Sequence, residues 1–210
     1  MSRLSVMPTL SAYRRPDGTA KLKTRARIMQ AVRELLEEGA FQESTVEDVA
    51  KRAGVSRATL YQHFGSRLGL VDAVCDTFAE NPALLEIRDT VVLENPGDAV
   101  RETIARAIRF WASEEAVLRH LYGLAAIDPM ATELVERQFR DRKQELERLV
   151  RNVSGALAPG VSKRTALALL LVATSFETYT QLRYRAGLSV KDLTALVQEQ
   201  AVASLLGAGR

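Results

Sequence analysis

The chain has 210 residues, of which 47% are hydrophobic and 26% charged, with a formal net charge of +3, as in an ordinary globular protein of one or two domains. The single cysteine, Cys75, excludes an internal disulfide framework, and the longest apolar run, residues 166–173, is far shorter than the ~20 residues of a membrane helix. We therefore expect a reducing, cytoplasmic location, no membrane partner and no signal peptide.

The N-terminal region carries most of the positive charge. Residues 1–27 hold seven arginines and lysines against Asp17 alone, a net charge of +6, so the rest of the chain sums to −3. Pro8 and Pro16 argue against regular structure, and residues 1–21 are expected to form a basic, disordered arm. Such an arm suits contact with nucleic-acid phosphates or insertion into a minor groove, and a merely solvated tail is the alternative.

A first helix is expected from about Thr24, which can cap it, to Glu38, just before Gly39. Arg25 and Arg27 stand in its first turn, where the helix dipole disfavours cations. A nearby phosphate would relieve this conflict, and a solvated basic turn is the alternative. The apolar positions at helical spacing are Ile28, Val32, Leu35 and Leu36.

Residues 45–64 have the pattern of two short helices joined by a tight turn. Gly54 is free to adopt a positive φ, and Ser56 can cap the second helix, which begins at Arg57. A helix, a glycine turn and a second helix form the helix-turn-helix, whose second helix enters the DNA major groove. A purely structural helical hairpin is the alternative. The apolar stripe of the first helix consists of Val46, Val49, Ala50 and Ala53.

The second helix of this motif directs polar side chains outward. Leu60 and Phe64, four residues apart, are expected to point into the core. Arg57 and Gln62 have the hydrogen-bonding geometry to read base edges. The side chains that suit phosphate oxygens are those of Thr59, Tyr61 and His63.

The run GVSRATLYQHFGSRLGLVDAV resembles the signature of the tetracycline-repressor (TetR) family, whose usual form is close to GVSxxTLYxHFxSKxxLxxAV. The resemblance is strongest over about residues 22–80. The matched positions are Val55, Ser56, Thr59, Leu60, Tyr61, His63, Phe64, Ser66, Leu70, Ala73 and Val74.

Arg67 departs from that signature. The family usually has a lysine here that touches DNA phosphate, and a guanidinium fork binds phosphate differently from an ammonium. The candidate DNA contacts are Thr45, Ser56, Arg57, Ala58, Thr59, Tyr61, Gln62, His63, Arg67 and Arg25.

Ser66 can cap a further helix from Arg67 to about Glu80, which links two regions in the resembled family. Cys75 on this helix is expected to be a small buried filler rather than a sensor thiol. Proline and glycine punctuation then predicts helices at about 83–94, 98–112, 114–126, 129–153, 162–186 and 189–206.

Two of these later segments have distinct patterns. The helix at 129–153 carries only a partial apolar stripe, and its other residues are expected to face solvent. The first half of the helix at 162–186 is apolar nearly all round, so it must be covered on every side, either by a second copy of the chain or within an ordinary core. The resemblance implies a homodimer through about residues 162–206. A charge in place of Leu170 or Leu196 should split this dimer if these residues face the partner.

Aromatic residues gather in the helices that would surround the interior of the C-terminal region. Aromatic rings with polar groups suit an apolar pocket with a few orienting hydrogen bonds, and plain core packing is the alternative. Because TetR-like proteins usually sense a small molecule here, the resemblance implies an unknown small-molecule effector. The candidate ligand-binding residues are Phe110, Trp111, Tyr122, Phe139, Phe176 and Tyr179, with Thr174, Ser175, Glu177 and Thr178 ranked second.

Signatures of catalysis are absent from the sequence. The only histidines are His63 and His120, and no HExxH, CxxC or GxxxxGK[ST] occurs, so we expect no catalytic residue, metal site or cofactor.

The sequence therefore predicts an all-α protein of about nine to ten helices. Its expected parts are the arm (1–21), a three-helix helix-turn-helix domain (22–66), a linking helix (67–80) and a ligand-binding and dimerisation domain, a helical bundle (81–210). The expected function is a homodimeric transcriptional regulator, usually a repressor in the resembled family, that binds double-stranded DNA at an inverted repeat. A helical small-molecule-binding or assembly protein without specific DNA binding is the main alternative.

Overall fold

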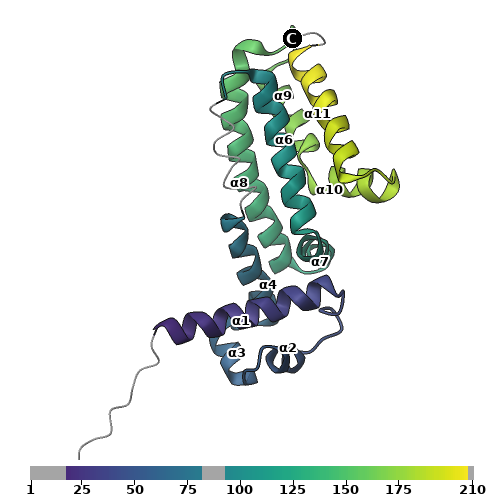
Figure 1. The fold of residues 1–210 in the computed structure, drawn as a ribbon. Coiled ribbons are helices and arrows are strands. Elements are labelled where there is room, and N and C mark those ends of the chain that lie inside the picture. The colour runs from purple at the N-terminus through teal and green to yellow at the C-terminus, as the bar shows by residue number, and fades with distance from the viewer. Residues whose placement is uncertain (1–17, 82–92, 208–210) are drawn as a thin grey trace, which may run out of the picture.

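The computed structural model describes residues 18–81 and 93–207, and every regular element in them is helical (Figure 1). The expected all-α class is confirmed. Residues 1–17 of the predicted arm and most of the predicted helix at 83–94 lie outside the described residues. The first elements are α1 (Gly18–Glu37), α2 (Val46–Arg52), α3 (Arg57–Phe64), α4 (Arg67–Asp76) and the 3-10 turn η1 (Thr77–Glu80).

The later elements form a bundle. Figure 1 shows α6, α8, α9 and α11 standing side by side, with α1, α2 and α3 in a separate layer and α4 reaching from that layer to the bundle. None of the helices in the described ranges is long and apolar enough to cross a membrane. The elements are α6 (Pro96–Ser113), α7 (Glu115–Ala125), α8 (Pro129–Val153), η2 (Ser154–Ala156), α9 (Lys163–Ala173), α10 (Phe176–Thr180), the π-helical turn η3 (Gln181–Arg185) and α11 (Val190–Leu206).

Fully buried apolar side chains hold both parts together. In the α1–α3 layer the stripe predicted on α1 is buried, with Ile28 and Val32 packed in one core with Val49 and Leu60. Burying a side chain of this size stabilises the fold by roughly 1.5–3 kcal/mol. The bundle core includes Ile104, Leu118, Leu121, Leu149, Leu170 and Leu193.

The start of α1 differs from the expectation. The helix begins at Gly18, so the predicted start at Thr24 is wrong, and residues 18–21 belong to a helix rather than to the arm. Residues 19–24 contain alanine, leucine and lysine, which favour helix and extend it outward from the packed part. As a result Lys21 and Arg25 are held on a helix.

The predicted single helix at 162–186 is also wrong, because it is interrupted at Thr174 and Ser175. The Ser175 hydroxyl accepts a hydrogen bond from the Thr178 backbone N–H at 3.0 Å and starts α10 as its N-cap. Serine and threonine side chains compete in this way with the helix backbone. The interruption leaves the Thr174 carbonyl available to side chains from other helices.

Leu170 is fully buried within the protomer, so the condition that it faces a partner is not met. A helix that is apolar all round does not reveal from its sequence which apolar side chains face inward. The large exposed apolar residues on α9 and α11 are Leu169, Val172 and Leu196, at 36%, 64% and 39% exposure.

Candidate nucleic-acid interface and ligand pocket

Local hydrogen bonds fix the ends of the two motif helices. Thr45 and Asp48 form a capping box, in which the Thr45 N–H donates to Asp48 Oδ2 at 2.7 Å and the Asp48 N–H donates to Thr45 Oγ1 at 3.2 Å. Gly54 adopts φ +63° in the turn, a conformation that other residues rarely take. Ser56 then caps α3, since its hydroxyl accepts from the Thr59 N–H at 3.1 Å.

The surface of α3 carries the predicted DNA contacts. Leu60 is fully buried and anchors the helix, whereas Tyr61 is 39% exposed. The Arg57 guanidinium lies over the Tyr61 ring, 5.4 Å from its centroid. Of the predicted contacts around this helix, Thr45, Ser56, Arg57, Ala58, Tyr61 and Gln62 are exposed, while Thr59 and His63 are half-buried.

α1 adds basic residues beside this surface. The Arg25 guanidinium lies over the Phe64 ring at 4.8 Å, next to the C-terminal end of α3. Burial, together with Lys21 and Arg25, lowers the pKa of His63. Sequence reasoning did not select Lys21, because it was assigned to the arm, and its only signal was its charge.

Arg67 has internal partners in the structure. Its guanidinium donates to the backbone carbonyls of Phe41, Gln42 and Ser44, in the loop before α2, and lies over the Phe41 ring at 4.3 Å. Burial lowers its pKa. The His120 ring meets Phe41 edge-on, with 5.0 Å between centroids. The phosphate contact expected for Arg67 stays a prediction, while its described contacts hold the loop.

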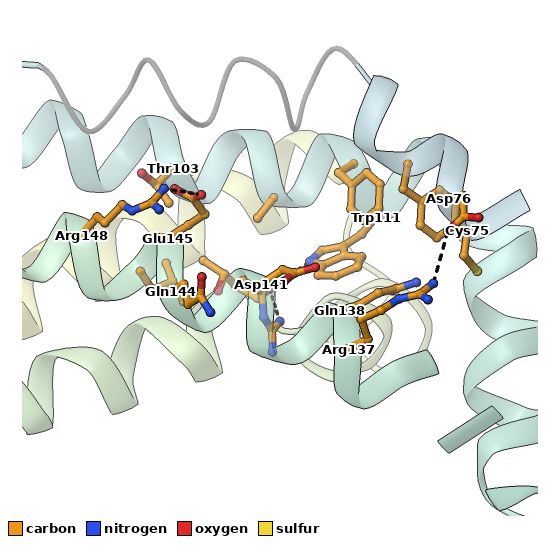
Figure 2. Close-up of a pocket in the computed structure, with 16 residues that line it drawn as sticks. Cys75, Asp76, Thr103, Trp111, Arg137, Gln138, Asp141, Gln144, Glu145 and Arg148 are labelled. Atoms are coloured by element: carbon orange, nitrogen blue, oxygen red, sulfur yellow. Dashed lines mark hydrogen bonds and ion pairs between the residues drawn. The ribbon is translucent and has the colours of Figure 1, made fainter. Parts of the chain in front are cut away.

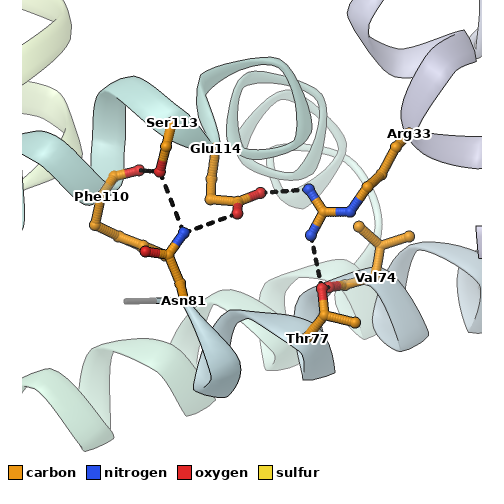
Figure 3. Close-up of polar contacts among 7 residues, drawn as sticks. All are labelled: Arg33, Val74, Thr77, Asn81, Phe110, Ser113 and Glu114. Carbon is orange, nitrogen blue, oxygen red and sulfur yellow. Dashed lines mark hydrogen bonds and ion pairs between the residues drawn. The ribbon is translucent and has the colours of Figure 1, made fainter. Parts of the chain in front are cut away.

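A polar cluster joins the α1–α3 layer to the bundle (Figure 3). Arg33 Nη1 donates to Glu114 Oε2 at 2.6 Å, and Nη2 donates to Thr77 Oγ1 at 2.6 Å. The other Glu114 oxygen accepts from Asn81 Nδ2 at 3.0 Å. Glu114 is only 8% exposed, so its carboxylate depends on Arg33 rather than on water for a counter-charge. The cluster connects α1, η1 and the α6–α7 corner.

A cavity of about 720 Å³ lies between the end of α4, η1, α6 and α8 (Figure 2). This volume falls within the roughly 300–1,000 Å³ typical of small-molecule sites. Its lining residues are Cys75, Asp76, Phe78, Thr103, Ala107, Phe110, Trp111, Arg137, Gln138, Asp141, Arg142, Gln144, Glu145, Leu146, Arg148 and Thr174.

Two of the six predicted ligand residues, Phe110 and Trp111, line this cavity. Phe176 packs behind Trp111 at 5.6 Å between centroids and continues to Tyr122 at 4.9 Å and Tyr179 at 6.0 Å. Burial raises the pKa of Tyr122 to about 12, so this phenol stays neutral. Tyr122, Phe176 and Tyr179 thus form an aromatic layer outside the cavity lining.

The remaining aromatic and polar candidates have other roles. Phe139 is 38% exposed and does not line the cavity. Tyr179 donates its hydroxyl to Glu115 Oε2 at 2.9 Å. Among the second-ranked residues Thr174 lines the cavity, and its carbonyl accepts from Trp111 Nε1 at 3.0 Å and from Arg142 Nη1 at 2.7 Å.

The expectation that α8 turns its polar residues to solvent is partly wrong. Seven of them, between Arg137 and Arg148, line the cavity. Gln138 and Arg142 continue the face that carries the buried residues Leu134 and Leu149. The missed signal was therefore a polar interruption in an apolar stripe at helical spacing.

The family described as "Bacterial regulatory proteins, tetR family" matches this chain over residues 28–74. The uncharacterized HTH-type transcriptional regulator YdeS of Bacillus subtilis is 29% identical over 153 residues, which cover 71% of this chain and 68% of YdeS.

Two solved structures have a similar fold. SmeT, described as the repressor of the Stenotrophomonas maltophilia multidrug efflux pump SmeDEF, gives a TM-score of 0.68 at 20% identity, covering 89% of this chain and 94% of SmeT. FadR of Bacillus subtilis, solved in complex with stearoyl-CoA, gives a TM-score of 0.69 at 17% identity, covering 88% of this chain and 99% of FadR.

Proposed function

Because the chain belongs to the TetR family of bacterial regulatory proteins, we propose that this transcriptional regulator is a repressor that binds an inverted-repeat operator as a homodimer and releases it when a small molecule binds. The observation that carries the proposal is the exposed surface of α3, where Arg57, Tyr61 and Gln62 project from a helix anchored by the buried Leu60. A structural hairpin would not need this set of side chains on its free face.

DNA recognition divides between base edges and phosphates. With α3 in the major groove, Arg57 and Gln62 read bases through their paired hydrogen-bonding groups. Thr45, Ser56 and Tyr61 contact phosphates and set the register of the helix. The remaining proposed contacts are Ala58, Thr59, His63, Arg67 and Arg25, to which we add Lys21 because it lies near His63.

The homodimer forms through α9 and α11. Leu169, Val172 and Leu196 leave apolar surface uncovered on these helices, and a second copy would cover it. Two-fold symmetry places the two α3 helices about 34–36 Å apart, or at a multiple of one DNA turn, and requires an inverted repeat in the operator.

The effector binds in the cavity and acts through α4. Cys75, Asp76 and Phe78, from the end of α4 and the following turn, line the cavity together with Trp111 of α6. A ligand there changes how α4 packs on α6 and α8, and a small tilt of α4 alters the spacing of the two α3 helices. FadR, a protein of similar fold, was solved in complex with stearoyl-CoA, which supports a small-molecule ligand for a protein with this fold.

Selection of random DNA fragments by the purified protein tests this function. We expect one inverted-repeat sequence to be enriched, and Tyr61→Phe protein to enrich it far less. Compounds that release the selected DNA should change the emission of Trp111, the only tryptophan. Enrichment of no sequence, with ligand binding intact, would favour a small-molecule-binding protein without specific DNA recognition.

A further inference from the structure

The arginines that line the cavity differ in whether they have an ion-pair partner. Of its three arginines, Arg137 pairs with Asp72 at 2.7 Å and Asp76 at 3.4 Å, and Arg148 pairs with Glu145 at 2.8 Å. Arg142 has no carboxylate within ion-pair distance among the residues that the structure describes. One cation on the wall therefore lacks a fixed counter-charge.

Arg142 is held in place by one hydrogen bond, and its other N–H donors have no described acceptor. Its Nη1 donates to the Thr174 carbonyl at 2.7 Å, the one acceptor that the described residues give it, although a guanidinium has five N–H donors. Its charged group lies 5.8 Å from the centroid of the Trp111 ring. Burial lowers its pKa, and Tyr122 and Glu177 act in the opposite direction without forming an ion pair. An anion in the cavity would supply the missing partner.

Gln138 provides a second unused donor on the same wall. It precedes Arg142 by four residues on α8, so the two side chains share one face. Its Nε2 is buried, and no oxygen or nitrogen acceptor among the described residues bonds it; its one neighbour of this kind is the Cys75 thiol, a weak acceptor. Buried donors are almost always satisfied, so an unpaired one at a cavity wall needs an explanation. The neighbouring Cys75 thiol, whose pKa burial raises to about 12, remains neutral.

The opposite wall is apolar. Phe78, Phe110 and Trp111 line it, and Figure 2 shows Trp111 facing Gln138 and Asp141. Asp141 is exposed, so water solvates its carboxylate at the rim. A flat apolar body on the rings would thus bring its polar end against α8.

We propose that the cavity binds an organic anion, an apolar or aromatic body with a carboxylate or sulfonate that accepts hydrogen bonds from Gln138 and Arg142. This inference rests on the proposed function, because it names the chemical class of the effector. Arg142 and Gln138 determine the specificity for charge, and the rings of Phe110 and Trp111 bind the body.

Two fluorescent probes that differ by one charged group test the preference. 8-Anilinonaphthalene-1-sulfonate and uncharged 1-anilinonaphthalene share their ring system, and energy transfer from the only tryptophan, Trp111, is strongest for a probe bound in the cavity beside it. The sulfonate should bind the full-length protein about tenfold more tightly or better, as charge-assisted hydrogen bonds contribute. Equal affinity for both probes would overturn the preference and leave the pocket itself intact.

Matched variants separate recognition from folding. Gln138→Leu removes only the weak contact with the Cys75 thiol, so it should keep the melting temperature and the affinity for the uncharged probe while weakening the binding of the sulfonate several-fold. Arg142→Gln should remove most of the preference, Arg142→Lys should restore part of it, and Arg140→Gln, at an exposed position outside the lining, should change nothing.

Two outcomes contradict the assignment in different ways. If Gln138→Leu and Arg142→Gln bind the sulfonate as tightly as the unchanged protein, these residues do not recognise the anion. If neither probe receives energy from Trp111 in the unchanged protein, the cavity takes no such ligand, and the ligand site of the proposed function fails with it.

Discussion

The Arg33 guanidinium on α1 and the Glu114 carboxylate between α6 and α7 form an ion pair of 2.6 Å between the α1–α3 layer and the bundle (Figure 3). The pair lies at the end of α4, where Arg33 also donates to Thr77. A shift of the bundle relative to α1 must therefore stretch or rearrange this contact.

Removal of one partner should destabilise the protein strongly. Arg33→Met leaves the buried Glu114 charge without its ion-pair partner, which costs about 3–5 kcal/mol in buried pairs. Arg33→Met combined with Glu114→Gln should recover much of this loss. Urea unfolding of the four proteins of the double-mutant cycle measures the coupling. The exposed pair Arg52–Glu38 is the control and should show no measurable coupling, and an equal result for both pairs would contradict the prediction.

Substitutions of Arg57 and Tyr61 should weaken DNA binding in different ways. Arg57→Ala removes a base-reading fork, so it should relax the preference at one operator position by about tenfold. Tyr61→Phe removes a phosphate contact and should weaken binding to all sequences alike. Competition assays with single-base operator variants distinguish the two patterns, and the same pattern for both substitutions would refute the division of roles.

Arg67→Lys tests whether this position resembles its usual family counterpart. A lysine can contact a phosphate but cannot reach the three backbone carbonyls that Arg67 holds. We therefore expect a lower melting temperature with an unchanged salt dependence of DNA affinity. An unchanged melting temperature would show that the loop before α2 does not depend on the guanidinium fork.

Operator affinity should depend on pH through His63. Its pKa is lowered in the free protein by burial, Lys21 and Arg25, and a bound phosphate would raise it. DNA binding then takes up a proton, so affinity should rise as the pH falls through the window below about 6.5. His63→Gln should lose this dependence and His120→Gln should keep it, as measured by fluorescence anisotropy. An unchanged dependence in His63→Gln would contradict the assignment.

The same lowered pKa has the opposite effect on folding. The unfolded chain binds a proton at His63 more readily than the folded protein does, so this residue reduces stability as the pH falls below about 6.5. The protonation of His63 therefore tightens DNA binding at low pH without stabilising the fold.

Charged substitutions on α9 and α11 should distinguish interface from core. Val172→Glu and Leu196→Glu place a charge on exposed apolar surface, so each should give a folded monomer. Leu170→Asp buries a charge within the protomer and should unfold it. Analytical ultracentrifugation with circular dichroism separates the two effects, and a folded dimer in all three variants would place the interface elsewhere.

The elements governed by local chemistry were predictable from the sequence. The caps Thr45, Ser56 and Ser66 each act through a backbone N–H three residues on, so the starts of α2, α3 and α4 follow from short patterns. The interruption at Thr174 was missed, because apolar residues on both sides continue the helical period. The Thr174 carbonyl accepts hydrogen bonds from Trp111 and Arg142, which come from helices distant in the sequence.

Only part of the candidate site could likewise be predicted from the sequence. The surface of α3 could be predicted because it faces away from the rest of the chain. The cavity could not, since it depends on where α4, α6 and α8 leave space, and no single segment encodes that space. Arg67 shows the limit of a motif match, because its contacts in the loop before α2 come from residues about 25 positions earlier.

The Phe41 ring lies between the Arg67 guanidinium and the His120 ring, so one side chain is covered by segments that are far apart along the chain. The three motif helices cannot complete this contact by themselves, because His120 belongs to α7. A fragment ending at Phe64 would lose both side chains that cover the Phe41 ring, and the loop carbonyls would lose Arg67 as their hydrogen-bond donor. We therefore expect α1–α3 to be less stable without α4 and α7, so grafting them onto another protein should require replacements for Arg67 and His120.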